Sequence, residues 1–185
     1  SGCAATADFC GSDPSTGPCA CLRLTPPRWN VRSDKLSMDQ CTDEFDRRMS
    51  AAKSSEESWS ALCELSACIA SHKLFTVMTM DMGAGLARRA FSDHPVEYPV
   101  SGAKPIHRDS WFDIVHGQKR SFVANTLDDI AKVFPDFELI GSLGRGSVVN
   151  LPVIVEGELA ATINLLNAEH YYTVERVAEL ESKLK

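Results

Sequence analysis

The chain has no long apolar run, no basic leader ahead of an apolar segment and no excess of positive charge. Without about 20 consecutive apolar residues, a transmembrane helix is not expected, and the first residues do not resemble a secretory signal. The 19 Lys and Arg against 25 Asp and Glu give a formal net charge of −6, which argues against a nucleic-acid or anionic membrane partner. We therefore expect a cytoplasmic protein that recognises a small molecule or another protein.

Cysteine is missing from residues 73–185 and crowded toward the other end of the chain. Five of the seven cysteines precede the regular part of the sequence: Cys3, Cys10, Cys19, Cys21 and Cys41. An odd, uneven set is not typical of a disulfide framework. The other two, Cys63 and Cys68, would lie about 140° apart around one helix and are poor partners for each other.

Neither a metal site nor a cofactor is predicted. Only one residue separates Cys19 from Cys21, which is too short for a zinc knuckle, and no histidine lies near them. The histidines are scattered without ligand spacing to a neighbour; they are His72, His94, His107, His116 and His170.

Residues 1–38 are rich in Gly, Ser, Pro and Cys and show no periodicity. Such a segment offers no amphipathic face to bury, so we expect a disordered or non-native tail. Our hypothesis is that Met38 is the natural initiator. The folded domain is then expected to span residues 39–185.

Hydrophobic spacing in residues 39–185 predicts alternating helices and strands. Helices are expected at 42–53, 54–72, 109–117, 126–134 and 135–141 and from 171 onward, and strands at 74–80, 86–91 and 121–124. Residues 146–167 complete the pattern as a hairpin that turns at Glu156 and Gly157, because glycine supplies the positive φ of a tight turn.

The closing hairpin is apolar on both faces, which only a sheet covered on both sides accommodates. Strand pairs with mostly short connections indicate a largely antiparallel sheet of about five or six strands. We therefore predict an α+β fold of three layers, with the terminal helices on one face of the sheet and pocket-forming loops and short helices on the other.

The hairpin sequence Ser147-Val-Val-Asn-Leu-Pro-Val followed by Glu156-Gly-Glu-Leu-Ala-Ala-Thr-Ile-Asn-Leu-Leu resembles the closing hairpin of a GAF domain. Tyr172-Thr-Val-Glu-Arg-Val-Ala-Glu-Leu resembles the final helix of that family, and the resemblance covers residues 56–185. It implies a small-molecule pocket between the sheet and its loops, and a homodimer through the terminal helices. With the chain ending at Lys185, the output is expected from a separate protein or from chemistry in this domain.

The expected function is that of a GAF-like sensory or regulatory domain that binds a small anionic metabolite. One alternative is an enzyme similar to the free methionine-(R)-sulfoxide reductases, which need two thiols within disulfide reach at the pocket. The lack of cysteine in residues 73–185 disfavours that activity, and no catalytic residue is predicted. Another alternative is an enzyme without a thiol that acts on a small carboxylate with Arg, His116 or His107 and the pocket asparagines. A purely structural or interaction domain with a filled pocket is the third class.

Local charge indicates where the ligand binds. Residues 85–120 carry six Lys and Arg against four Asp and Glu, together with aromatic side chains that suit a ring. The candidate ligand-binding residues are Arg88, Arg89, Tyr98, Lys104, Trp111, His116, Asn125, Asn150 and Asn164. The alternative is that the cations lie on a solvated edge of the sheet and Trp111 lies in the core, as the usual exposure of charge favours.

Three details stay open in the sequence. Arg88 and Arg89 are adjacent in a strand, so at most one of them faces a pocket. Asn150 and Asn164 bind either a ligand or only the protein. Arg145, in the glycine-rich loop 141–146, is expected to be a mobile contact for an anion.

Overall fold

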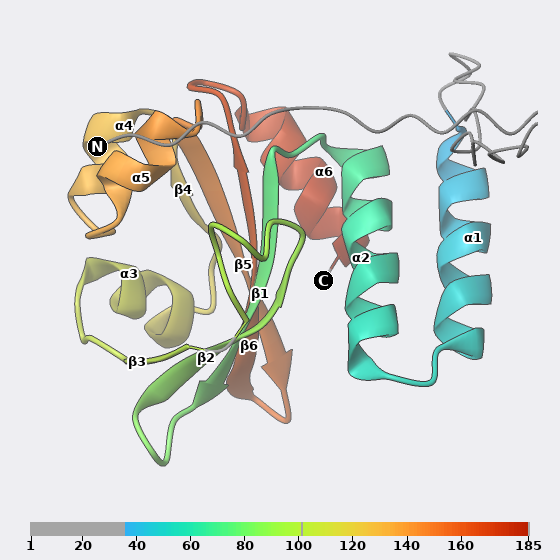
Figure 1. Ribbon diagram of the computed structural model, residues 1–185, viewed down its shortest axis with the longest axis horizontal. Coiled ribbons are helices and arrows are strands. Elements are labelled where there is room, and N and C mark those ends of the chain that lie inside the picture. The colour runs from blue at the N-terminus through green and yellow to red at the C-terminus, as the bar shows by residue number, and fades with distance from the viewer. Residues whose placement is uncertain (1–35, 101, 185) are drawn as a thin grey trace, which may run out of the picture. The chain divides into compact units, whose positions relative to one another are not determined.

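The computed structural model of the protein describes residues 36–100 and 102–184. The expected tail therefore lies almost wholly outside the described residues, together with its four cysteines. The described part contains one sheet of six strands in the order β3-β2-β1-β6-β5-β4, in which every neighbouring pair is antiparallel (Figure 1).

The strands are β1 (Leu74–Asp81), β2 (Leu86–Ser92), β3 (Ala103–Pro105), β4 (Phe122–Ala124), β5 (Ser147–Val155) and β6 (Glu158–Asn167). The helices are α1 (Met38–Ala51), α2 (Ser55–Ile69), α3 (Ser110–Phe112), α4 (Leu127–Ala131), α5 (Phe137–Ser142) and α6 (Val174–Leu184), and the π-helical turn η1 (Asp113–Gly117) continues α3. Of these elements, only the short edge strand β3 is not predicted by the sequence pattern.

The closing hairpin forms as predicted. Glu156 and Gly157 both have positive φ, 50° and 85°, as a two-residue turn between twisted strands requires. The pairing of β5 with β6 runs from Ser147 opposite Asn167 to Val155 opposite Glu158. The strands β1 and β2 form a second antiparallel hairpin. Because β6 also pairs with β1, the two hairpins join at the centre of the sheet.

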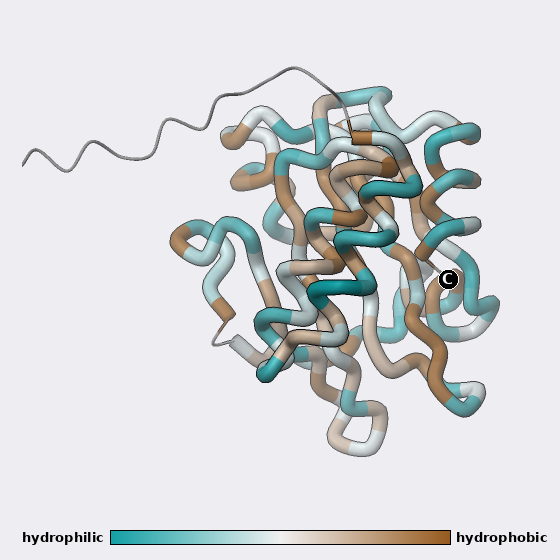
Figure 2. Tube along the Cα trace, turned by 90° about the vertical axis from the view of Figure 1, so that its right-hand side faces the viewer, coloured by the Kyte–Doolittle hydropathy of each residue, from teal (hydrophilic) through white to brown (hydrophobic). Residues whose placement is uncertain are grey.

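The three-layer α+β fold is confirmed. The helices α2 and α6 lie on one side of the sheet, with α1 outside α2, and the short helices α3, α4 and α5 lie on the other side (Figure 1). Seen from the α1 side, hydrophobic strands lie behind a helix with many hydrophilic residues (Figure 2). No helix in residues 36–100 and 102–184 combines the length and apolarity needed to cross a membrane.

Alternation along the strands separates two apolar clusters. Phe75 and Val77 of β1 belong to a core cluster on the side of α2 and α6, with Ile163 and Leu165 of β6. Leu74, the residue before Phe75, points to the other face and belongs to a second cluster with residues of α4 and α5. The sheet is therefore buried on both faces, as the hairpin sequence predicts.

Side-chain caps explain where the helices begin. Ser54, Asp109 and Thr126 each accept a backbone N–H in the first turn of α2, α3 and α4. At α1, Ser37 and Gln40 form a reciprocal capping box. This cap precedes Met38, so a chain beginning at Met38 would lose it.

The structure corrects the expectation that cysteine forms no disulfide. Cys41 of α1 is bonded to Cys68 of α2, with a Cα–Cα distance of 6.5 Å. Spacing along one helix excluded only the pair Cys63 and Cys68, whereas antiparallel packing of α1 on α2 brought a more distant cysteine into reach. Disulfides are rare in the cytosol, so this bond weighs against the cytoplasmic expectation.

The disulfide should contribute measurably to stability. Closing a loop with a sequence separation of 27 restricts the unfolded chain, and the expected loss of unfolding free energy in Cys41→Ser is about 3 kcal/mol. Urea denaturation measures it. Wild-type protein under a thiol reductant should match the variant, and equal stability of oxidised, reduced and mutant protein would contradict the assignment.

Candidate functional site

A cavity of about 330 Å³ lies on the side of the sheet opposite α2. Four strands supply its floor through Thr76 and Met78 of β1, Arg89 of β2, Asn150 of β5 and Asn164 of β6. The segment from β3 to α3 and the connection between α4 and α5 supply its walls, with side chains that include Lys104, His107, Asp109, Trp111, Phe134 and Asp136.

Six of the nine candidate ligand-binding residues line this cavity: Arg89, Tyr98, Lys104, Trp111, Asn150 and Asn164. They come from five helices or strands and one loop, which the fold brings together. The adjacent arginines are now distinguished, because Arg89 lines the cavity and Arg88 is an exposed residue that does not.

The other two candidates hold the protein together away from the cavity. The His116 ring stacks on Phe112, with centroids 4.4 Å apart and an interplanar angle of 15°. The Asn125 side chain donates to the carbonyl of Tyr172 at 2.9 Å and accepts from its N–H at 3.2 Å. Asn125 therefore ties the end of β4 to the segment before α6.

A chain of polar side chains crosses the floor of the cavity. The Trp111 indole N–H donates to Asn150 Oδ1 at 3.0 Å, Asn150 Nδ2 donates to Asn164 Oδ1 at 2.6 Å, and Asn164 Nδ2 donates to Thr76 Oγ1 at 3.2 Å. The register explains it, since Asn164 lies opposite both Asn150 and Thr76. The protein thus supplies hydrogen-bond partners to both asparagine side chains, although each amide has one further N–H that could donate to a ligand.

Arg89 and Tyr98 form a corner of the cavity with unused hydrogen-bonding capacity. The guanidinium carbon lies 5.2 Å from the centroid of the Tyr98 ring, and Nη1 donates to the Pro99 carbonyl at 3.0 Å. Among the described residues, neither Arg89 Nε nor the Tyr98 hydroxyl has a hydrogen-bond partner, and both atoms are buried. Buried donors without partners are rare and costly.

Burial also sets the ionisation of this corner. It lowers the pKa of Arg89, an effect that the Asp136 carboxylate opposes. Burial, reinforced by Asp136, raises the pKa of Tyr98 to about 12. At neutral pH the corner therefore offers a guanidinium and a neutral phenol, both able to donate to an anion.

Sequence reasoning missed several residues of the cavity. Thr76 and Thr162 were signalled by alternation, since they share a strand face with the asparagines and line the same space. Asp136 had no such signal, because it was assigned only to the start of a helical turn.

The expectation for Arg145 is wrong. Its side chain is 5% exposed, and Nε and Nη2 donate to the Lys73 carbonyl at 3.2 and 2.9 Å. Arg145 is thus a fixed link between the start of β5 and the start of β1.

The described residues that line the cavity include no cysteine. Cys63, the free thiol in this part of the chain, lies on α2 across the sheet. Burial, with the nearby Asp93 and Glu64 carboxylates, raises the pKa of this thiol to about 12, which disfavours the nucleophilic thiolate. A thiol-based reductase mechanism therefore has no support in these residues.

Comparison by sequence and by structure gives different results. No known protein-family profile matches the chain, and no curated protein matches its sequence. Among solved structures, the GAF domain of a phosphoenolpyruvate-protein phosphotransferase from Coxiella burnetii is similar at a TM-score of 0.58 and 14% identity, over 80% of this chain and 89% of that one.

Two further structures show the same likeness. The GAF domain of the corresponding phosphotransferase from Acinetobacter matches at a TM-score of 0.58 and 9% identity, over 80% of this chain and 89% of that one. The chromophore-binding domain of a bacteriophytochrome from R. palustris matches at 0.57 and 8%, over 78% of this chain and 56% of that one. At such identities the likeness concerns the fold, which is GAF-like.

The polar chain should matter for stability in a graded way. Asn164→Ala leaves Asn150 and Thr76 without their buried partner, so we expect a loss of about 3 kcal/mol in unfolding free energy. Trp111→Phe removes only the outermost bond and should cost about 1 kcal/mol. Chemical denaturation of the two variants checks the order, and a larger loss in Trp111→Phe than in Asn164→Ala would contradict it.

Proposed function

We propose that this GAF-like domain is a sensory or regulatory domain whose small-molecule ligand occupies the cavity between the sheet and the α3–α5 layer. The observation that carries the proposal is the pair of buried donors, Arg89 Nε and the Tyr98 hydroxyl, without partners among the described residues. A ligand acceptor at this corner would satisfy both. One of the similar structures is a chromophore-binding domain, which supports ligand binding as the general role.

The lining indicates the chemistry of the ligand. Arg89 and Lys104 share the cavity lining with Asp109 and Asp136, so the formal charges of these four side chains cancel and a polyanion would find no net attraction. Most other lining side chains are apolar, among them Met78, Leu166, Val133, Phe134 and Ile140. We therefore propose a ligand with one carboxylate or phosphate at the Arg89 corner and an apolar or ring portion over the sheet.

The same proposal includes a partner that carries the signal. Binding at the cavity is transmitted to a separate output protein or to a second copy of the chain. For a homodimer through the terminal helices, the support is the exposure of Leu36, Met49 and Val174 at 58%, 41% and 82%.

The adjacent arginines provide a matched test of the ligand site. In a thermal-shift screen of aromatic carboxylates and phosphomonoesters, the best compound should bind Arg89→Met roughly tenfold to a hundredfold more weakly than wild type, since a charged hydrogen bond is lost. Arg88→Met removes the same charge from the neighbouring residue, whose side chain points to the opposite face of β2. This variant should bind the compound as wild type does.

Two results would oppose the ligand site. Equal losses in Arg88→Met and Arg89→Met would indicate a nonspecific charge effect. Wild-type binding by Arg89→Met would remove the corner from the site.

Dimerisation has its own test. Light scattering coupled to size-exclusion chromatography should give twice the 20.2 kDa chain mass. Met49→Glu should shift the measured mass toward that of the monomer, because it would bury a charge in the proposed dimer interface. A monomer across micromolar concentrations would contradict the proposed assembly.

A further inference from the structure

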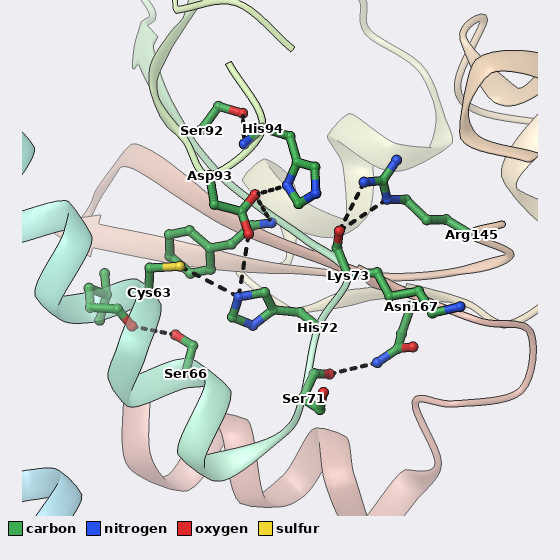
Figure 3. A network of polar contacts seen from close by, with 12 residues as sticks. Cys63, Ser66, Ser71, His72, Lys73, Ser92, Asp93, His94, Arg145 and Asn167 are labelled. Atoms are coloured by element: carbon green, nitrogen blue, oxygen red, sulfur yellow. Dashed lines mark hydrogen bonds and ion pairs between the residues drawn. The ribbon is translucent and has the colours of Figure 1, made fainter. Parts of the chain in front are cut away.

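Three potential metal ligands meet on the helix side of the sheet, away from the cavity. Cys63 comes from α2, His72 from the loop before β1, and Asp93 from the end of β2 (Figure 3). One donor atom from each, the thiol sulfur, a ring nitrogen and a carboxylate oxygen, lies within 4.8 Å of the other two. The His72 side chain is 6% exposed and that of Asp93 is 23% exposed.

The arrangement is not that of a catalytic triad. In a triad the nucleophile and the carboxylate contact opposite nitrogens of the imidazole. Here Cys63 Sγ and Asp93 Oδ2 both approach Nε2 of His72, at 3.5 and 3.7 Å. Nδ1 of the same ring is buried and has no hydrogen-bond partner among the described residues.

Hydrogen bonding accounts for only one of these two contacts, because 3.5 Å between Sγ and Nε2 is within the range of a bond to sulfur. The 3.7 Å between Nε2 and Oδ2 is too long for a hydrogen bond. Ligands of a tetrahedral zinc ion, at about 2.0–2.3 Å from the metal, lie roughly 3.3–3.6 Å from one another. The sulfur–nitrogen distance of 3.5 Å falls in that range, and a shift of a few tenths of an ångström would bring the carboxylate into it.

We propose that Cys63 Sγ, His72 Nε2 and Asp93 Oδ2 bind a divalent transition-metal ion, with Zn²⁺ as the best match to this mixed donor set. On binding, the Cys63 thiol releases its proton to solvent. The thiolate and the carboxylate then balance the two positive charges, and the imidazole stays neutral. Water fills the fourth position of the tetrahedron.

The surroundings of Asp93 fit a ligand role. Its other oxygen, Oδ1, accepts from the Phe75 backbone N–H at 2.9 Å and lies 2.8 Å from Nδ1 of His94. Ligating carboxylates are commonly held by such outer bonds. Oδ1 is thereby fixed, and Oδ2 is left directed toward His72 and Cys63 (Figure 3).

Co²⁺ is the probe for this site, because a thiolate ligand produces a sulfur-to-cobalt charge-transfer absorption. The background is the full chain with Cys3, Cys10, Cys19 and Cys21 replaced by serine and the Cys41–Cys68 bond intact. We expect one Co²⁺ per chain with that absorption, displaced by Zn²⁺. Cys63→Ser should abolish the absorption, and His72→Gln should weaken binding at least about tenfold.

Two variants keep the test decisive if Cys63→Ser folds poorly. Asp93→Asn retains an oxygen for the Phe75 N–H but loses the charge, so it should also bind Co²⁺ at least about tenfold more weakly. His116→Gln, a histidine outside the cluster, should bind as the background does. No charge-transfer absorption in the background chain, its persistence in Cys63→Ser, or unchanged affinity in Asp93→Asn would overturn the proposal.

Discussion

The pairing of β1 with β6 and of β6 with β5 is the constraint on which both sides of the molecule depend. Successive side chains of a strand point to opposite faces, so this register sends Phe75, Ile163 and Leu165 into the helix-side core. The intervening Thr76 and Asn164 line the cavity. A slip of one residue would exchange the two sets and bury the asparagines in an apolar core.

The same central strand connects the two candidate sites. The backbone N–H of Phe75 holds the Asp93 carboxylate on one face, and the next residue, Thr76, ends the polar chain on the other. The apolar cavity with its Arg89 corner and the Cys63, His72 and Asp93 cluster thus occupy opposite faces of one sheet. They differ in donor chemistry, which is why we assign them an organic ligand and a metal ion respectively.

Local signals in the sequence predicted most of the fold and part of the cavity. Glycine at the turn and β-rich flanks located the closing hairpin, and alternation showed that Arg88 and Arg89 diverge. Which arginine faces inward depends on what covers each face, which alternation alone does not tell. The Cys41–Cys68 bond and the meeting of Cys63 with His72 and Asp93 arise from packing between elements distant in the chain, so ligand spacing along the sequence did not show them.

The central claim is that the cavity holds a small molecule, and native mass spectrometry of the freshly purified protein tests it most directly. We predict an added mass, in at most one copy per chain, that denaturation releases as a single organic acid or phosphate. Arg89→Met should emerge without it, while Arg88→Met retains it. A bare chain mass, together with no stabilisation by any small anion, would contradict the account.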